Sequence, residues 1–355
     1  MDNITKIQKA LQEFGLDAIM LTDEADRLYA TGFRATDGLA VVTREKAWFL
    51  TDSRYIEAAE ITVAGAEVGL VTAQNRYTDW LLKIVREAPV NVLGIQEESM
   101  SCGEYLRWEK ELPCELKPAQ KLMNSLRRSK SPTELEKMIS AQRIAERAFD
   151  EVLGLLRPGV TEKEIAAELI YRFLKYGAEG VSFDPIVVFG PKTSMPHGVP
   201  GDRKLEYGDF VTLDFGCVKD GYCSDTTRTV AVGAVTDEMR RVYEVVLEAQ
   251  LRGIEAAKPG VPGCQVDMAA RRVIEDAGFG EYFGHSFGHS LGLRIHETPN
   301  ASPSEKEPLP EGAVISAEPG IYLPGKFGVR IEDVLYLTGA GNENITRLPK
   351  QLLIL

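Results

Sequence analysis

Residues 208–233, GDFVTLDFGCVKDGYCSDTTRTVAVG, contain the pair of aspartates from which the rest of the chain can be interpreted. The stretch predicts two strands rich in β-branched and aromatic residues, joined by a turn at Lys219-Asp220-Gly221. Each strand carries an aspartate, Asp214 or Asp225, where a buried strand prefers an apolar side chain. If the loop has an even number of residues, the two aspartates share one face, directly opposed or one diagonal apart. A three-residue loop would put them on opposite faces.

Two like charges on one face of a sheet are costly unless a cation lies between them. The aspartate pair therefore indicates a metal site. The hairpin by itself leaves one alternative open, which is a solvated face with two unrelated aspartates.

Length and charge limit the class of protein. The 355 residues exceed what one hydrophobic core usually supports, which predicts two domains. The 41 basic and 53 acidic residues give a formal net charge of −12, which argues against nucleic acid or an anionic membrane as the main partner. Residues 1–15 predict an amphipathic surface helix without a signal-peptide core, and no apolar run approaches the roughly 20 residues that span a bilayer. Five cysteines without metal-like spacing predict reduced thiols in a cytoplasmic protein.

The first third of the chain alternates helix-like and strand-like segments. Short β-type runs, DAIMLT, LAVVT and KAWFLTD, are separated by polar turns, which predicts an α/β layer domain. This part contains no histidine, so we expect it to shape a cleft or to pair subunits. Near residues 123–131 the composition changes, and the following SPTE predicts a capping box with proline at the first helical position. We therefore expect two domains, 1–124 and 125–355.

The second domain contains an apparent internal duplication. Two short segments, RPGV and KPGV, each precede a predicted helix. Further on, GDFVTLDFG (208–216) matches GAVISAEPG (312–320), so that Asp214 corresponds to Glu318. A true repeat would pack its halves about a pseudo-two-fold axis and bring both carboxylates towards that axis. Chance similarity between short segments is the alternative.

All four histidines lie in the second domain, His197 in SMPHGVPG and the others in GHSFGHSLGLRIHE. A single histidine is more often a hydrogen-bonded structural residue than a ligand. In VRIEDV, however, a further carboxylate interrupts an apolar strand pattern, and four carboxylates with one imidazole suit Mn²⁺, Mg²⁺ or Co²⁺ better than a structural zinc. Four carboxylates balance the charge of two divalent ions, which indicates a two-metal site that bridges an activated water. The predicted ligands are Asp214, Asp225, His289, Glu318 and Glu332.

Five stretches, in order along the chain, resemble the successive signatures of the aminopeptidase P/prolidase (creatinase-like, "pita-bread") metallopeptidases. They are PHGVPGDRKLEYGDFVTLDFG, DGYCSDTTRT, GHSLGLRIHE, EPGIY and RIEDV. LYATGF and TDSRY resemble that family's N-terminal domain, and RRSKSPTELEKM resembles its interdomain junction. The resemblance implies an α/β (α+β) chain, with a creatinase/prolidase-type N-terminal domain followed by a pita-bread catalytic domain with pseudo-two-fold symmetry.

The resemblance also implies an activity, which is hydrolysis of the bond between an N-terminal residue and a following proline by a hydroxide that bridges two metal ions. The tertiary amide of proline lacks an N–H, so peptidases that need this donor cannot cleave there. By resemblance, Asp214 would bind one ion, Asp225 and Glu332 both, and His289 and Glu318 the other. Further residues would hold the substrate, stabilise the oxyanion or brace the ligands: His197, His296, His285, Arg330 and Tyr322.

The sequence leaves alternatives for the oligomeric state, the metal ion and the length of the substrate. Relatives commonly form homodimers, and Mn²⁺, Co²⁺, Zn²⁺ or Fe²⁺ suits such ligands, with Mn²⁺ the expected ion. Some dedicated dipeptidases carry an arginine after the HE-x-P motif for the free carboxylate of a dipeptide, and Asn300 stands there instead. This favours longer peptides, unless Arg294 or an arginine of a partner subunit compensates. A metal-free creatinase-like hydrolase or a peptide-binding scaffold would have lost several of the ligands, and a methionine aminopeptidase would not need the first domain.

Overall fold

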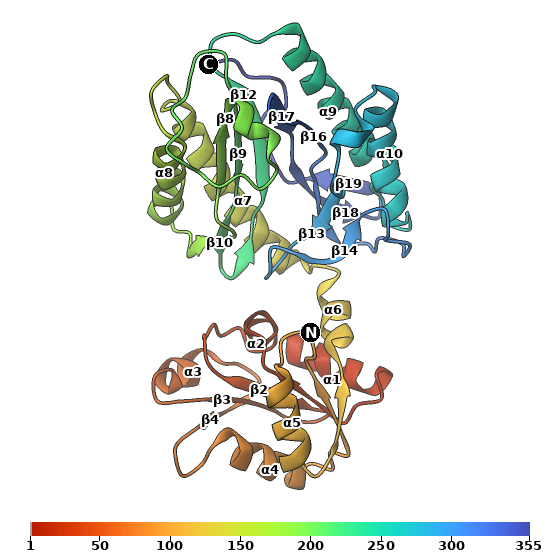
Figure 1. Ribbon diagram of the computed structural model, residues 1–355. Helices are drawn as coiled ribbons and strands as arrows, with labels where there is room; N and C mark the ends of the chain where they lie inside the picture. Colours follow the sequence, from red (N-terminus) through yellow and green to blue (C-terminus); the bar gives the residue numbers. More distant parts are fainter. Residues whose placement is uncertain (1) are drawn as a thin grey trace. The chain divides into compact units, whose positions relative to one another are not determined.

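The computed structural model describes residues 2–355 and divides into two compact units, one ending at Arg127 and the other comprising Arg128–Leu355 (Figure 1). The boundary predicted at 124/125 lies inside helix α6 (Gln120–Arg127). The last residue of that helix explains why α6 belongs to the first unit. The Arg127 guanidinium donates to the Asp26 carboxylate at 2.7 Å, and both side chains are buried.

The first unit is built on a six-stranded mixed sheet with the strand order β4-β3-β2-β1-β5-β6. The runs predicted as strands form β1, β2 and β3, which confirms the α/β layer domain. The predicted amphipathic helix is α1, which buries Ile4, Ile7 and Leu11. The strands are β1 (Ala18–Leu21), β2 (Leu39–Thr43), β3 (Ala47–Thr51), β4 (Glu67–Leu70), β5 (Val92–Ile95) and β6 (Glu115–Pro118). The helices besides α6 are α1 (Asn3–Glu13), α2 (Glu24–Thr31), α3 (Ile56–Thr62), α4 (Tyr77–Glu87) and α5 (Cys102–Glu111).

The second unit begins with the helix that the capping box predicts. The Ser131 hydroxyl accepts from the Glu134 N–H, the Glu134 carboxylate accepts from the Ser131 N–H at 2.9 Å, and Pro132 opens the helix. These contacts satisfy backbone donors that the first helical turn leaves without partners. The helices of this unit are α7 (Pro132–Leu153), α8 (Glu162–Lys175), α9 (Asp237–Ala256) and α10 (Gly263–Asp276), with short 3₁₀ turns η1 (Gly190–Ser194) and η2 (Gly280–Tyr282).

Two sheets form the centre of the second unit, with the orders β12-β9-β8 and β14-β13-β15-β18-β19. Helices α7 and α8 precede the first sheet in the chain, and α9 and α10 precede the second. Figure 1 shows α8 and the α9–α10 pair on opposite outer sides of these strands. The same order of helices and strands in both halves agrees with the predicted duplication. The strands are β7 (Gly180–Val181), β8 (Ile186–Phe189), β9 (Phe210–Phe215), β10 (Cys217–Lys219), β11 (Tyr222–Cys223), β12 (Thr226–Ala231), β13 (Gly288–Ser290), β14 (Glu297–Ala301), β15 (Val314–Ala317), β16 (Gly320–Leu323), β17 (Phe327–Arg330), β18 (Asp333–Thr338) and β19 (Gly341–Asn344).

The stretch 208–233 folds as a hairpin interrupted near its middle. The turn has two residues, Asp220 and Gly221, with φ of 50° and 79°, and it joins β10 to β11. Gly216 then approaches the next strand so closely that a Cβ there would lie 2.0 Å from the Ser224 carbonyl oxygen. Beyond this point β9 pairs with β12, and Asp214 faces Thr227. Asp225 precedes Thr227 by two positions, so the two aspartates lie one diagonal apart, as one of the predicted arrangements requires.

Strand β9, which carries Asp214, is fixed by aromatic packing. The next residue, Phe215, is fully buried, with its ring centroid 5.3 Å from that of Phe149 in α7 and 6.4 Å from that of Phe173 in α8. Replacing a buried phenylalanine with alanine typically lowers the free energy of unfolding by about 3–5 kcal/mol, because the burial of the ring is lost and a cavity is left behind. We expect Phe215→Ala to lower the free energy of unfolding by that amount in a denaturant titration. The exposed Tyr207 serves as the control, and equal losses for Tyr207→Ala and Phe215→Ala would contradict this packing role.

Candidate functional site

The five predicted ligands come from separate segments of the second unit, at or next to strand ends. They are Asp214 in β9, Asp225 just before β12, His289 in β13, Glu318 just after β15 and Glu332 just before β18. The Glu332 N–H donates to the Thr227 carbonyl at 3.1 Å, which ties the start of β18 to β12. The antiparallel pairing of β15 with β18 brings the segment of Glu318 beside that of Glu332.

The side chains of these residues converge. One ligand atom each from Asp225, His289 and Glu332 lies within 4.8 Å of the others. The His289 Nε2 atom is 3.5 Å from Asp225 Oδ2 and 3.3 Å from Glu318 Oε1. Asp225 and Glu332 are almost fully buried. The structure therefore brings four of the five predicted ligands into one cluster.

Asp214 joins the same cluster from the side of Arg330. Its Oδ2 atom accepts from Arg330 Nη2 at 2.5 Å, whereas its Oδ1 atom is buried without a hydrogen-bond partner. Buried polar atoms rarely lack a partner, so this oxygen needs an explanation. Asp214 lies one diagonal from Asp225 across the hairpin, and after burial its charge is the next cause that raises the pKa of Asp225.

The electrostatics of the cluster are unfavourable without a cation. Burial, followed by the charges of neighbouring carboxylates, raises the pKa of Asp225 and of Glu332 well above the usual range. Burial likewise raises the pKa of Glu318. Carboxylates that share a buried site without a counter-ion hold protons instead of charge. The acidic donors, the single imidazole and the bare Asp214 oxygen fit divalent cations, which prefer such ligands.

Three of the remaining predicted site residues form one hydrogen-bonded chain beside the cluster. His285 Nε2 lies 2.8 Å from the Tyr322 hydroxyl, which accepts from Arg330 Nη1 at 2.8 Å. Burial raises the pKa of Tyr322 to about 12, so its hydroxyl keeps its proton. Burial alone would lower the pKa of Arg330, but Tyr322 and the neighbouring carboxylates hold it well above the usual range.

The two other histidines occupy the open side of the site. The His296 ring meets that of His289 edge to face, with centroids 4.4 Å apart. Burial lowers the pKa of His296, and a charge on the neighbouring His289 would lower it further. His197 is exposed on the loop after η1 and follows Pro196, whose carbonyl accepts from Arg330 Nη1 at 3.3 Å. Neutral imidazoles at the edge of an acidic cluster can both donate and accept hydrogen bonds.

Two known domain families match the chain over most of its length. The creatinase/prolidase N-terminal domain matches residues 3–129, and metallopeptidase family M24 matches residues 136–339. The chain belongs to metallopeptidase family M24. The predicted class of enzyme and the predicted order of its two domains are thereby confirmed.

Relatives of this M24 metallopeptidase cover both of its domains. The solved Xaa-Pro dipeptidase from Bacillus anthracis is 41% identical, with a TM-score of 0.96 over 99% of each chain. The solved X-Pro aminopeptidase from Thermotoga maritima is 37% identical, with a TM-score of 0.92 over 98% of this chain and 100% of that one. An Xaa-Pro dipeptidase from Pyrococcus furiosus is 35% identical over 99% of both sequences. The predicted pita-bread architecture of the catalytic domain agrees with these neighbours.

Thr227, beside the acidic cluster, was not among the site residues predicted from the sequence. Thr227 donates its hydroxyl proton to Glu332 Oε2 at 2.7 Å and accepts from Arg330 Nε at 3.1 Å. It therefore fixes one carboxylate oxygen of Glu332 by a hydrogen bond. The sequence did contain a signal for this residue, because Thr227 follows Asp225 by two positions and therefore lies on the same face of the strand as Asp225.

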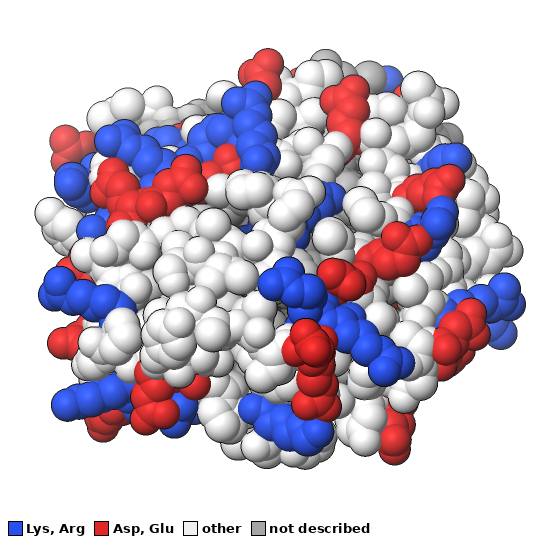
Figure 2. Space-filling model, turned by 90° about the horizontal axis from the view of Figure 1, so that it is seen from above, with Lys and Arg blue, Asp and Glu red and all other residues white. Residues whose placement is uncertain are grey.

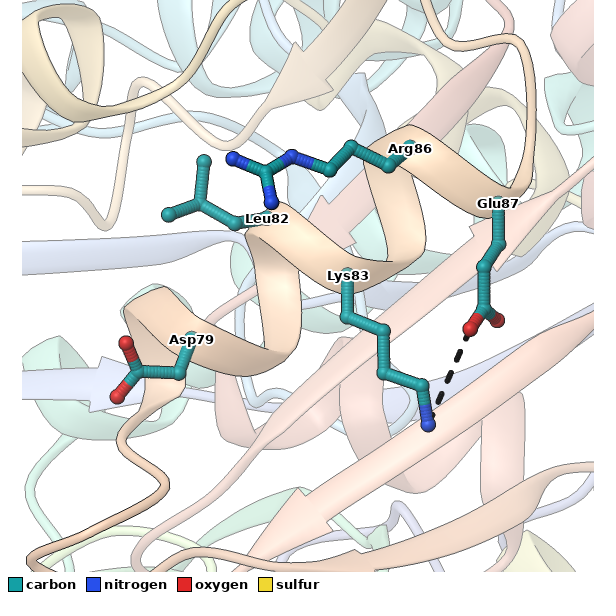
Figure 3. A pocket seen from close by; sticks show the side chains of 5 residues that line it. All are labelled: Asp79, Leu82, Lys83, Arg86 and Glu87. Carbon is teal, nitrogen blue, oxygen red and sulfur yellow. Dashed lines mark ion pairs between the residues drawn. The ribbon is translucent and has the colours of Figure 1, made fainter.

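A pocket elsewhere on the surface is unrelated to the acidic cluster. It lies on α4 in the first unit and is lined by Asp79, Leu82, Lys83, Arg86 and Glu87, none of which is a predicted site residue (Figure 3). Its single drawn ion pair joins Lys83 and Glu87 at 4.0 Å, between two exposed side chains. Exposed pairs of this kind contribute little energy. The predicted site residues therefore belong to the acidic cluster and not to this hollow.

One face of the molecule carries side chains of both charges. Figure 2 shows a face on which lysine and arginine side chains lie beside aspartate and glutamate side chains rather than in a continuous basic field. A continuous basic surface is the usual mark of a nucleic-acid site. Among residues 2–355, no helix combines the length and the apolar character needed to cross a membrane.

Proposed function

We propose that this M24 metallopeptidase is an exopeptidase that hydrolyses the bond between an N-terminal residue and a following proline. The observation that carries the proposal is the buried convergence of Asp225, His289 and Glu332, with Glu318 and Asp214 beside them. Two divalent ions match the charge of the four carboxylates. Relatives named Xaa-Pro dipeptidase and X-Pro aminopeptidase support proline as the residue after the scissile bond.

Each ligand has a distinct place in the proposed centre. Asp225 and Glu332 would be shared between two ions, with Asp214 on one side and His289 and Glu318 on the other. When bound, such ions polarise the scissile carbonyl and acidify a water molecule that serves as the nucleophile. Arg330 contributes by occupying Oδ2 of Asp214, so that Oδ1 is the oxygen that would bind a cation.

The residues on the open side would handle the substrate. We assign His197 and His296 to the carbonyl oxygen next to the scissile bond, where a donor stabilises the negative charge that develops. Burial lowers the pKa of His296, so near neutral pH this ring is uncharged and offers one N–H. His285 and Tyr322 keep Arg330 in place, and Thr227 holds Glu332.

A metal-free creatinase-like hydrolase or a peptide-binding scaffold is the second candidate. The buried carboxylates count against it, because a scaffold gains nothing from retaining several groups that repel one another. Mn²⁺ as the resident ion, a homodimer and a cytoplasmic location belong to the proposal through the family resemblance. Metal analysis of the purified protein and light scattering, with a mass near twice 39.2 kDa expected, test the first two.

The choice between dipeptides and longer peptides depends on a cation for the free carboxylate of a dipeptide. Asn300 cannot supply one, but Arg294 lies two residues from His296. We expect the Mn²⁺-reconstituted protein to cleave an Xaa-Pro dipeptide. We also expect Arg294→Met to raise the KM for this dipeptide about tenfold or more, since a charged hydrogen bond contributes roughly 1.5–3 kcal/mol.

A matched Xaa-Pro-Xaa peptide is the comparison substrate, because its carboxylate lies farther along the chain. Arg252→Met, on the exposed side of α9, is the control variant. Equal effects of Arg294→Met on both peptides would rule out a carboxylate contact. Cleavage of the longer peptide alone would identify an aminopeptidase, as the asparagine at position 300 favours. No cleavage of either peptide would refute the proposed function.

A further inference from the structure

The segment Phe283–Phe287 carries His285 although it belongs to no strand. It runs between η2 and β13 and pairs with no strand, although the Phe287 carbonyl accepts from the Glu318 N–H at 2.8 Å. Arg271 of α10 holds the part of the segment that contains His285. Its Nη1 donates to the Phe283 carbonyl at 3.0 Å and its Nη2 donates to the His285 carbonyl at 2.7 Å. The guanidinium also lies over the Phe283 ring, 4.2 Å from the centroid.

Asp267, one turn earlier on α10, completes a clamp on this segment. It accepts from Arg271 Nε at 2.7 Å and from Nη2 at 3.0 Å, and it also accepts from the Phe287 N–H at 2.9 Å. Its side chain is only 2% exposed, which makes the ion pair far less screened than a surface pair. A two-point arginine–carboxylate pair fixes orientation as well as distance. Three backbone groups of the Phe283–Phe287 segment are thus held by two side chains.

The clamp has a direct consequence for the His285 ring. Nδ1 of His285 lies 2.8 Å from the Ser286 carbonyl oxygen, which can only accept, so Nδ1 carries the proton. In the neutral ring, Nε2 then has a lone pair and accepts from the Tyr322 hydroxyl at 2.8 Å. With its proton directed at His285, the Tyr322 oxygen is free to accept from Arg330. Arg330 in turn binds Oδ2 of Asp214.

We infer that Asp267 and Arg271 are positioning residues for the peptidase site. By fixing the Phe283–Phe287 segment they hold His285 as the Nδ1–H tautomer against Tyr322. Through Tyr322 and Arg330 they orient Asp214 so that its second oxygen is left for the cation that the site would hold. Within residues 2–355, neither side chain forms a hydrogen bond or an ion pair with a proposed metal ligand, so a search of the sequence for ligands does not find them. The effect on turnover rests on the proposed function, whereas the effect on the His285 tautomer does not.

The test uses the full chain loaded with Zn²⁺, which has no unpaired electrons to broaden the signals of nearby rings, and ¹⁵N-labelled histidine, of which the chain has four. Arg271→Lys keeps the charge but loses the two-point geometry, and Asp267→Asn keeps the size and an acceptor for the Phe287 N–H. The control is Arg252→Lys, whose arginine pairs with Glu248 and Glu255 on an exposed face. We expect wild-type and control His285 to show the Nδ1–H pattern, and both clamp variants to show a mixture of tautomers.

The kinetic expectation is a fall in kcat with little change in KM for an Xaa-Pro dipeptide. Removing a group that orients a metal ligand typically costs 10–100-fold, and we expect both clamp variants to fall in this range. An unchanged His285 spectrum in both variants would overturn the assignment, even if activity fell. Loss of the circular dichroism spectrum in both would also overturn it, by making the clamp a general stabiliser. If the wild type cleaves no proline peptide but the tautomer shifts, the proposed function fails and the clamp stands.

Discussion

Replacing Asp214 with asparagine is expected to lower kcat about 10³-fold while the fold remains intact. The substitution preserves the size of the side chain but removes one negative charge from the proposed metal centre. A metal that polarises the reacting group supplies several kcal/mol of transition-state stabilisation, and about 4 kcal/mol corresponds to this change in rate. The Arg330 ion pair is lost as well, because an amide cannot hold the guanidinium as a carboxylate does. Steady-state kinetics with an Xaa-Pro peptide at saturating Mn²⁺ measures the effect.

Asp220→Asn provides the matched control for this experiment. Asp220 is an exposed aspartate in the turn of the same hairpin, at φ 50°, a conformation that asparagine tolerates well. Its replacement changes the net charge by the same amount, so near-normal activity is expected. If Asp214→Asn retained activity close to that of Asp220→Asn, Asp214 would not be a ligand.

Metal removal is expected to destabilise the catalytic unit, and increasingly so as the pH rises. The folded metal-free protein holds Asp225 and Glu332 at raised pKa values because both are buried among other carboxylates. Below the ordinary values of 3.8 and 4.5, both groups are protonated in the folded and the unfolded chain, and stability is at its fullest. As the pH rises from these ordinary values to the raised pKa values, the unfolded chain releases protons that the folded chain still holds, so the folded state loses stability. Bound cations remove this penalty.

The expected size of the effect follows from the cost of buried, uncompensated charge. Breaking a buried ion pair costs about 3–5 kcal/mol, and about 1 kcal/mol shifts Tm by roughly 2–4 °C in a unit of this size. We therefore expect the metal-loaded protein to melt about 10 °C above the metal-free protein at pH 8, with a much smaller difference at pH 5. Scanning calorimetry at both pH values measures this.

Asp225→Asn separates this electrostatic effect from a general one. It removes one of the repelling carboxylates, so the metal-free variant should melt above the metal-free wild type at pH 8. The same variant should gain little from added Mn²⁺, since a shared ligand is gone. A metal-free variant that melted below the metal-free wild type would show that Asp225 is not strained by its neighbours.

The features predicted best from the sequence are those encoded locally. The capping box at Ser131 and the turn at Lys219-Asp220-Gly221 depend on residues a few positions apart, and both appear in the structure. The structure also fixes the loop at two residues, Asp220 and Gly221, a length that the sequence left open. Asp214 and Asp225 could be singled out because each is an aspartate in a strand pattern where a buried position prefers an apolar side chain. The five motifs in their order along the chain then indicated the family, whereas any one of these motifs alone is not specific enough.

Features that depend on distant partners were not predicted. Thr227 reads as an ordinary β-branched strand residue, and only the structure shows that its hydroxyl binds Glu332. Asp267 and Arg271 read as a common i, i+4 pair on a helix surface, but they hold the segment of His285. The pairing of Asp26 with Arg127 likewise joins residues far apart in the chain and keeps α6 with the first unit. Periodicity shows which face of an element is buried, not which side chain it meets.

The most direct test of the account is an anomalous difference map from crystals of the protein grown with Mn²⁺. We predict two peaks in the second unit, with Asp225 and Glu332 between them, Asp214 on one and His289 with Glu318 on the other. The Oδ1 atom of Asp214 should be the one that contacts an ion, because Arg330 occupies Oδ2. A single peak, or peaks away from these five side chains, would contradict the proposed two-metal centre.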